Sequence, residues 1–120
     1  MSCTSASSPV ASEHDAADVA AFSVDVAVAD GYCVLTVNGD VDVKTAVDLG
    51  AASERIFSLA DVREMVVDLG GVTFMDSTGL GALVAIRNRA LERSAAFHLR
   101  DIPPAVAKLL RIVGLEQILG

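Results

Sequence analysis

The stretch over residues 65–81, MVVDLGGVTFMDSTGLG, constrains the fold of this chain more than any other. Its apolar, β-branched beginning predicts a buried strand over 65–69. The pair Gly70-Gly71 is expected to end this strand, and a short apolar loop follows. An amphipathic run then predicts a helix from Ser77 to about Arg93.

The start of this helix is a favourable position for a negative charge. Asp76 is the expected N-cap, which puts Ser77 on the first turn, beside free N–H groups and the positive end of the helix dipole. A phosphate is well suited to such a place, and Thr78 is the alternative hydroxyl. Gly79 and Gly81 keep the surface around Ser77 low, at a cost of up to ~1 kcal/mol each against alanine. That cost indicates that another molecule approaches Ser77 closely.

The rest of the chain alternates strand and helix patterns. Strands are expected over 22–28, 32–37 and 96–99; Asp30-Gly31 is the expected hairpin turn, and Asn38-Gly39 the expected end of the second strand. A helix is expected to run to about Leu59, capped by Thr45, which has capping-box spacing to Asp48, or by Asp42. A last helix follows Pro103-Pro104 and stops at Gly114. The order β-β-α-β-α-β-α predicts an α/β fold, a mixed four-stranded sheet with helices packed on it.

Residues 1–21 are rich in Ser, Ala and Asp and lack periodicity, which predicts a disordered tail before a single domain over 22–120. Helical spacing also predicts the side chains that face the core. These are Ala46, Leu49, Ser53, Ile56, Phe57 and Ala60 in the first helix, Leu80, Leu83, Val84, Ala90 and Leu91 in the second, and Val106, Leu109, Leu110 and Val113 in the third.

Charge and cysteine content exclude several classes of function. The net charge of −7 argues against binding to nucleic acid or to an anionic membrane surface. Cys3 and Cys33 have neither a metal-binding nor a disulfide spacing, so we expect no metal or other cofactor and a cytoplasmic location. No apolar run approaches the ~20 residues of a membrane span, and the N-terminus does not resemble a signal peptide.

Residues 68–69 and 72–81, DL and VTFMDSTGLG, resemble the signature of the anti-sigma factor antagonists, the STAS domain family. The resemblance runs from about Phe22 to the C-terminus. In that family the serine after the aspartate is a phosphorylation switch, and this serine corresponds to Ser77. Residues 39–46, GDVDVKTA, also resemble a family segment that helps to form the partner-binding surface, with Val41 where the family usually has Leu. The resemblance therefore implies a partner surface made of Asp40, Asp42, Thr45, Asp76, Ser77, Thr78, Gly79 and Gly81.

This resemblance implies a non-enzymatic switch. The unmodified protein would bind an anti-sigma factor with serine kinase activity and free a sigma factor. Phosphorylation of Ser77 would release the protein, and a separate phosphatase would reset it. The free chain is expected to be a monomer. An alternative within the same family is a STAS subunit of a transporter or of a sensory multiprotein assembly.

Other classes of function fit the residues less well. A small serine hydrolase needs a glycine two residues before the serine, where Met75 stands, and only His14 or His98 could act as its base. Asp40-Val41-Asp42 resembles the nucleophile motif of dehalogenase-type phosphatases, but the further lysine and acidic motifs of those enzymes are missing, and a solvated loop with a helix cap explains this segment. Asp76-Ser77-Thr78 could likewise be a helix cap and nothing more.

Overall fold

The computed structural model describes residues 22–119, so the tail predicted for 1–21 lies outside the described residues. The elements are β1 (Ser23–Ala29), β2 (Tyr32–Val41), α2 (Val43–Leu59), β3 (Glu64–Met75), α3 (Ser77–Glu92), β4 (Ala96–Arg100), α4 (Pro104–Ile112) and α5 (Glu116–Leu119). In the described range no helix is long and apolar enough to cross a membrane.

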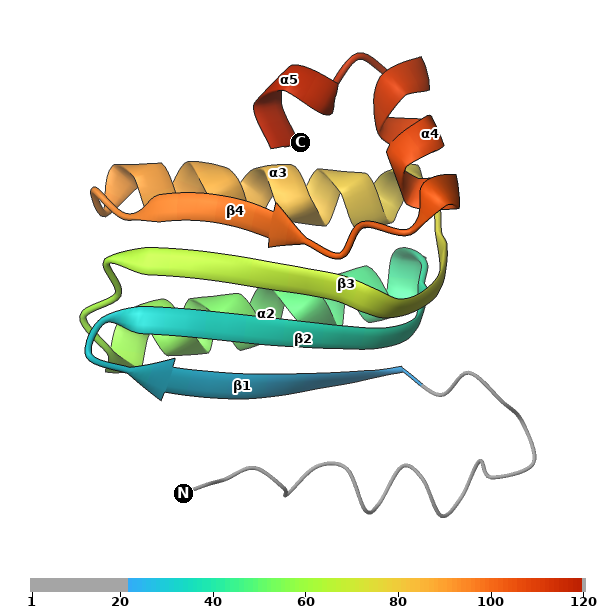
Figure 1. Ribbon diagram of the computed structural model, residues 1–120. Helices are drawn as coiled ribbons and strands as arrows, with labels where there is room; N and C mark the ends of the chain where they lie inside the picture. Colours follow the sequence, from blue (N-terminus) through green and yellow to red (C-terminus); the bar gives the residue numbers. More distant parts are fainter. Residues whose placement is uncertain (1–21, 120) are drawn as a thin grey trace.

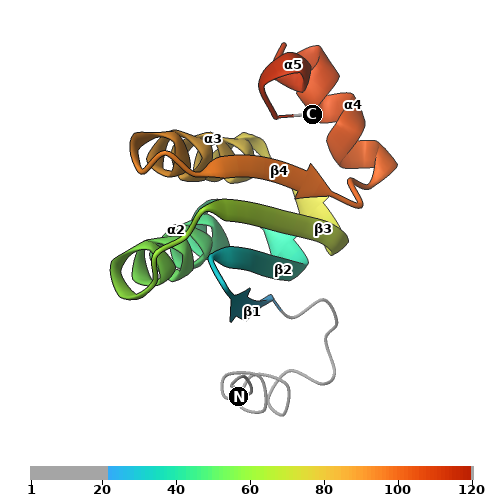
Figure 2. The same ribbon diagram turned by 60° about the vertical axis from the view of Figure 1, so that its left-hand side comes forward.

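The four strands form one mixed sheet in the order β1-β2-β3-β4, which confirms the predicted α/β architecture. β1 and β2 pair antiparallel, whereas β3 is parallel to both β2 and β4. Figures 1 and 2 show α2 and α3 side by side on one face of the sheet, with α4 and α5 beyond β4. The hairpin turn forms at Asp30-Gly31 as predicted, because both residues have positive φ values, 51° and 85°.

The core lies between the sheet and the two long helices. Every second residue of β2 and β3 faces the helices, so Leu35 and Val67 are paired in register and fully buried. The predicted inner face of α2 is confirmed, with Phe57 almost fully buried. Two predicted core residues are wrong: Leu91 is 50% exposed although its neighbour Ala90 is fully buried, so it lies on the outer side of the last turn of α3, and Val113 is exposed as the C-cap residue of α4. Ile86 is buried in α3 instead.

Both central strands run further than the sequence indicates. Neither Asn38-Gly39 nor Gly70-Gly71 ends a strand, because the two pairs lie next to each other in the β2–β3 ladder. The register shifts on both sides of this point, and Gly39 has a φ of 91°. A Cβ on Gly71 would collide with the side-chain amide of Asn38. The glycines therefore allow an irregular, close pairing that carries both strands onward to Val41 and Met75.

Candidate functional site

The candidate site lies at the edge of the sheet where β2 and β3 end. The two strands are parallel, and their last residues, Val41 and Met75, are partners in the ladder. Each strand is followed by a single cap residue and then a helix, so α2 and α3 begin side by side. The backbone N–H of Asp76 donates to the carbonyl of Val41 at 3.3 Å, which joins the two helix starts directly.

Asp42 caps α2. Its Oδ1 accepts the N–H groups of Lys44 at 3.0 Å and of Thr45 at 3.1 Å, and the Thr45 hydroxyl accepts the N–H of Asp42 at 2.9 Å. This reciprocal capping box decides between the two predicted caps in favour of Asp42, with Thr45 at the third helical position. The bond from the Thr45 N–H is the main cause that lowers the pKa of Asp42, so this carboxylate stays charged.

Asp40, the third polar residue of this segment, ties the ends of the two strands together. Its Oδ1 accepts the hydroxyl of Thr73 at 2.6 Å, and its backbone carbonyl accepts the hydroxyl of Thr45 at 2.7 Å. Thr73 was not predicted as a site residue, because the sequence indicated that β3 ends at Gly70-Gly71, before this residue. With Asp40 bound to Thr73 and Asp42 capping α2, both members of the Asp-x-Asp motif have structural partners.

Asp76 caps α3 as predicted. Its Oδ1 accepts the N–H groups of Thr78 at 2.9 Å and Gly79 at 3.2 Å, together with the hydroxyl of Thr78. The bond from the Thr78 hydroxyl is the main cause that lowers the pKa of Asp76, and the nearby charge of Asp42 opposes this shift. The N–H groups of Thr78 and Gly79 are therefore already occupied. Fewer of them are available to a bound phosphate than the sequence indicates.

The two hydroxyls at the start of α3 differ in their surroundings. Ser77 is the first residue of the helix and is exposed, and within residues 22–119 its hydroxyl forms no hydrogen bond. Thr78 is also exposed, but its hydroxyl is bound to Asp76. Ser77 is thus the hydroxyl that another molecule can reach without breaking a bond within the protein.

The two glycines near Ser77 do different things. Gly79 is buried, and a Cβ there would lie 2.6 Å from Met75 Cγ and 3.0 Å from Val41 Cγ1. Its missing side chain therefore lets α3 pack closely on the ends of β2 and β3, and the expected role of keeping the outer surface low does not apply to it. Gly81 is exposed with open space around it, so that expectation can hold for Gly81 alone.

The histidine proposed as a hydrolase base does not lie at this edge. His98 is on β4, in register with Val66, and its Nε2 lies 3.4 Å from Glu64 Oε2 at the start of β3. Ser77 follows the other end of β3. His14, the alternative base, is outside the described residues. Over 22–119, no group of three or more His, Cys, Asp or Glu side chains could hold a metal ion.

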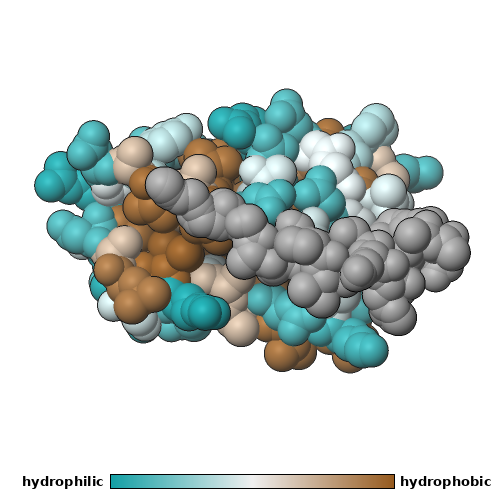
Figure 3. Space-filling view, turned by 90° about the horizontal axis from the view of Figure 1, so that it is seen from below, coloured by the Kyte–Doolittle hydropathy of each residue, from teal (hydrophilic) through white to brown (hydrophobic). Residues whose placement is uncertain are grey.

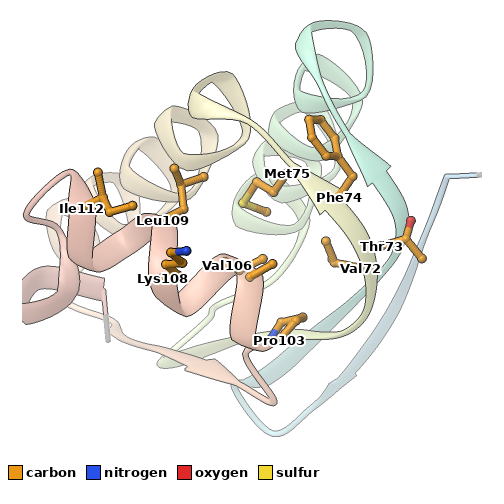
Figure 4. A pocket seen from close by; sticks show the side chains of 10 residues that line it. Val72, Thr73, Phe74, Met75, Pro103, Val106, Lys108, Leu109 and Ile112 are labelled. Carbon is orange, nitrogen blue, oxygen red and sulfur yellow. The ribbon is translucent and has the colours of Figure 1, made fainter.

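An apolar cavity of about 290 Å³ opens between the end of β3 and α4 (Figure 4). Phe74, which sequence reasoning did not single out, lines it from β3 and is half exposed, whereas Met75 beside it is buried. The remaining lining residues are Val72, Thr73, Pro103, Ala105, Val106, Lys108, Leu109 and Ile112. An accessible apolar hollow therefore lies next to the helix start that carries Ser77.

Comparisons with known proteins agree with this geometry. Residues 24–120 match the family model described as "Mlab, STAS domain". A STAS-domain containing protein of Pseudomonas aeruginosa is 34% identical over 91 residues, which cover 75% of this chain and 88% of that protein. An anti-sigma-B factor antagonist of Staphylococcus aureus is 24% identical over 100 residues, 82% of this chain and 90% of that protein.

Solved structures with a similar fold include an anti-sigma factor antagonist. The crystal structure of an anti-sigma factor antagonist from Mycobacterium paratuberculosis superimposes with a TM-score of 0.72 and is 27% identical. The match covers 82% of this chain and 83% of that one. The family model spans residues 24–120, which include both helix starts.

Proposed function

The chain belongs to the STAS domain family, and we propose that it acts as an anti-sigma factor antagonist that is switched by phosphorylation of Ser77. The observation that carries the proposal is the exposed Ser77 hydroxyl, which has no hydrogen bond in the described range, at a helix start where its neighbour Thr78 is bound to Asp76. The protein is a cytoplasmic binding partner without turnover of its own. Its partner is an anti-sigma factor with serine kinase activity, and a separate phosphatase resets it.

In the proposed cycle, the unmodified protein binds the kinase with the β2–β3 edge, and the sigma factor is freed. The Ser77 oxygen then attacks the terminal phosphorus of ATP. The new O–P bond forms as the bond to ADP breaks, and the kinase takes up the hydroxyl proton. Asp76 keeps its role as the cap of α3, with its Oδ1 accepting three hydrogen bonds.

Phosphorylation would act on the interface and leave the fold unchanged. A phosphoserine adds about −1.5 to −2 charges, and Asp76 has already taken the two N–H groups that would best stabilise them. The phosphate therefore stays at the surface beside Asp76 and Asp42. An interface closed over Ser77 must then desolvate this charge next to the phosphates of the bound nucleotide. Losing ~2.8 kcal/mol of binding energy would weaken the affinity about a hundredfold.

The test begins with Ser77→Ala as bait, because this variant should stay bound to the kinase. The captured protein is identified, purified and incubated with the wild-type chain and ATP, and the phosphate is mapped by mass spectrometry. We expect it on Ser77, with release of the complex and an unchanged circular dichroism spectrum. Phosphate found only on Thr78 or within residues 1–21 would overturn the proposal. Capture of a membrane transporter complex in place of a kinase would instead favour the role of a transporter subunit.

A further inference from the structure

Strand β1 forms one edge of the sheet and pairs with β2 alone (Figure 2). Within residues 22–119, the N–H and C=O groups on its outer side therefore have no strand partner. Natural proteins commonly protect such an edge with lysine, proline or a bulge. The sequence of β1, SVDVAVA, contains neither of these residues, its register with β2 is regular, and Asp25 is its only charged residue. The edge is therefore open to a further strand.

A stripe of valines follows this edge on the side that faces the helices. Val24, Val26 and Val28 each pair with a buried residue of β2. None of the three is itself fully buried, and Val28 is 44% exposed. On a complete sheet, a further strand with its own apolar residues would cover this stripe.

The helix layer adds to the apolar surface at the hairpin end of β1. After α2 the chain returns to the hairpin, where the N–H of Arg63 donates to the carbonyl of Gly31 at 2.7 Å. Leu59, the last residue of α2, is 81% exposed at this end. Figure 3 looks at the molecule from the β1 side and shows hydrophobic residues gathered toward its left-hand, hairpin end. Exposed apolar groups gathered along an open edge indicate a surface that another molecule covers.

This edge is nearly neutral, although the whole chain carries a net charge of −7. The ion pair of Glu54 with Arg89 lies on the side of α2 that faces α3, so the opposite side of α2 faces β1. The charged residues on that opposite side, on β1 and around the hairpin are Asp25, Asp30, Lys44, Asp48, Arg55, Asp61 and Arg63. Four of these residues are acidic and three are basic. An acidic protein can therefore approach a copy of itself here with little repulsion.

We propose that two copies of this chain pair antiparallel through β1, with a twofold axis at Val26, and form one continuous eight-stranded sheet. In this register Val24 of each copy lies opposite Val28 of the other, so the valine stripe continues across the contact. Asp25 lies opposite Ala27, whereas an axis at Asp25 would place two carboxylates face to face. The inference is independent of the proposed function and replaces the monomer that the resemblance implies for the free chain.

The size of the contact predicts a weak, reversible dimer. A strand of seven residues is about 23 Å long, and a sheet with one layer of helices is roughly 20 Å deep. Such a contact buries on the order of 1,000 Å² in total, which is at the low end for specific interfaces, so we expect a dissociation constant of about 10–100 μM. The twofold axis places the two Ser77 residues at opposite ends of the dimer, where both stay exposed.

Two substitutions at Ala27 test the register by sedimentation equilibrium of the full chain. Ala27 is exposed and would face Asp25 of the other copy. Ala27→Lys should therefore tighten the dimer about fivefold, because it adds two pairs of opposite charge, and Ala27→Asp should weaken it by about the same factor. Weaker dimers for both variants would place Ala27 opposite itself and overturn the proposed register.

Val28→Lys tests the valine stripe, with Val113→Lys as its control. The two valines are similarly exposed, 44% and 46%, but Val113 is the C-cap residue of α4. We expect Val28→Lys to weaken the dimer at least tenfold and Val113→Lys to dimerise like the wild type, with unchanged circular dichroism for both. Equal dimerisation of these two variants would overturn the proposal. If Val28→Lys fails to fold, the variants at the exposed Ala27 still decide.

Two other occupants of the edge have distinct outcomes. A full chain that stays monomeric, while a chain without residues 1–20 dimerises, would assign the edge to that segment and overturn the proposal. A monomeric wild type whose binding to the purified kinase is lost in Val28→Lys would assign it to the kinase, with the same consequence. Sedimentation needs no kinase, so a failed dimer and a failed phosphorylation of Ser77 are separate results.

Discussion

At the scale of single residues, the two glycines of the first α3 turns should respond to substitution in opposite directions. Gly79→Ala forces a methyl group against Met75 and Val41, and such overpacking costs about 1–3 kcal/mol. Gly81→Ala meets open space and gains helix propensity, up to about 1 kcal/mol. Urea unfolding of the two variants and the wild type measures both effects. Equal destabilisation by the two substitutions would contradict the packing described for Gly79.

Asp76, the capping carboxylate of α3, should make the stability of the folded protein depend on pH. Folding lowers the pKa of Asp76 below 3.8, the ordinary value for an aspartate, so its contribution to stability is present above that pH and is lost as the pH falls through the folded pKa. Asp76→Asn keeps a capping side chain but does not titrate. The melting temperature of the wild type should therefore exceed that of Asp76→Asn at pH 7, and the difference should shrink toward pH 3. A difference that is constant with pH would show that the charge of Asp76 does not matter.

At the scale of elements, α3 carries two leucines that the sequence pattern places in the core, and only one of them is buried. Leu83 is fully buried, so Leu83→Ala should cost about 2–5 kcal/mol. Leu91 follows two turns later in the same sequence pattern but is half exposed, and Leu91→Ala should change stability by less than about 0.5 kcal/mol. Chemical denaturation of this matched pair measures the difference. A large loss for Leu91→Ala would contradict the exposure described for this side chain.

The same elements show what the sequence could and could not predict. The caps Asp42 and Asp76, the hairpin turn and the inner face of α2 are local, because each depends on residues within one or two turns of each other. The length of β2 and β3 is not local. Glycines such as Gly39 and Gly71 usually end a strand. Here Asn38 pairs with Gly71 and Gly39 with Val72 in one ladder, so both strands continue through an irregular pairing. The pairing of Thr73 with Asp40 and the exposure of Phe74 follow from that extension, so the sequence did not reveal them.

At the scale of the whole molecule, we expect residues 1–21 to contribute little to the stability of the domain. Deleting residues 1–20 should leave the melting temperature and the affinity for the kinase nearly unchanged, since these residues lack the periodicity of a packed element. Calorimetry and a binding titration on the shortened chain measure the two quantities. A loss of several degrees in the melting temperature, or a tenfold weaker affinity, would show that the segment docks on the domain.

The antiparallel pairing of β1 determines how this protein should be attached to a sensor surface. Because β1 runs against β2, it begins where β2 ends: Ser23 is in register with Asn38, whose amide donates to the Ser23 hydroxyl at 3.3 Å. Whatever precedes residue 22 thus enters the domain close to the β2–β3 edge that carries Ser77, whereas α5 lies beyond β4 and against α3 (Figure 1). A chain immobilised directly at position 22 should capture the kinase slowly and incompletely, and the same chain tethered through its last residue should present the edge to solution.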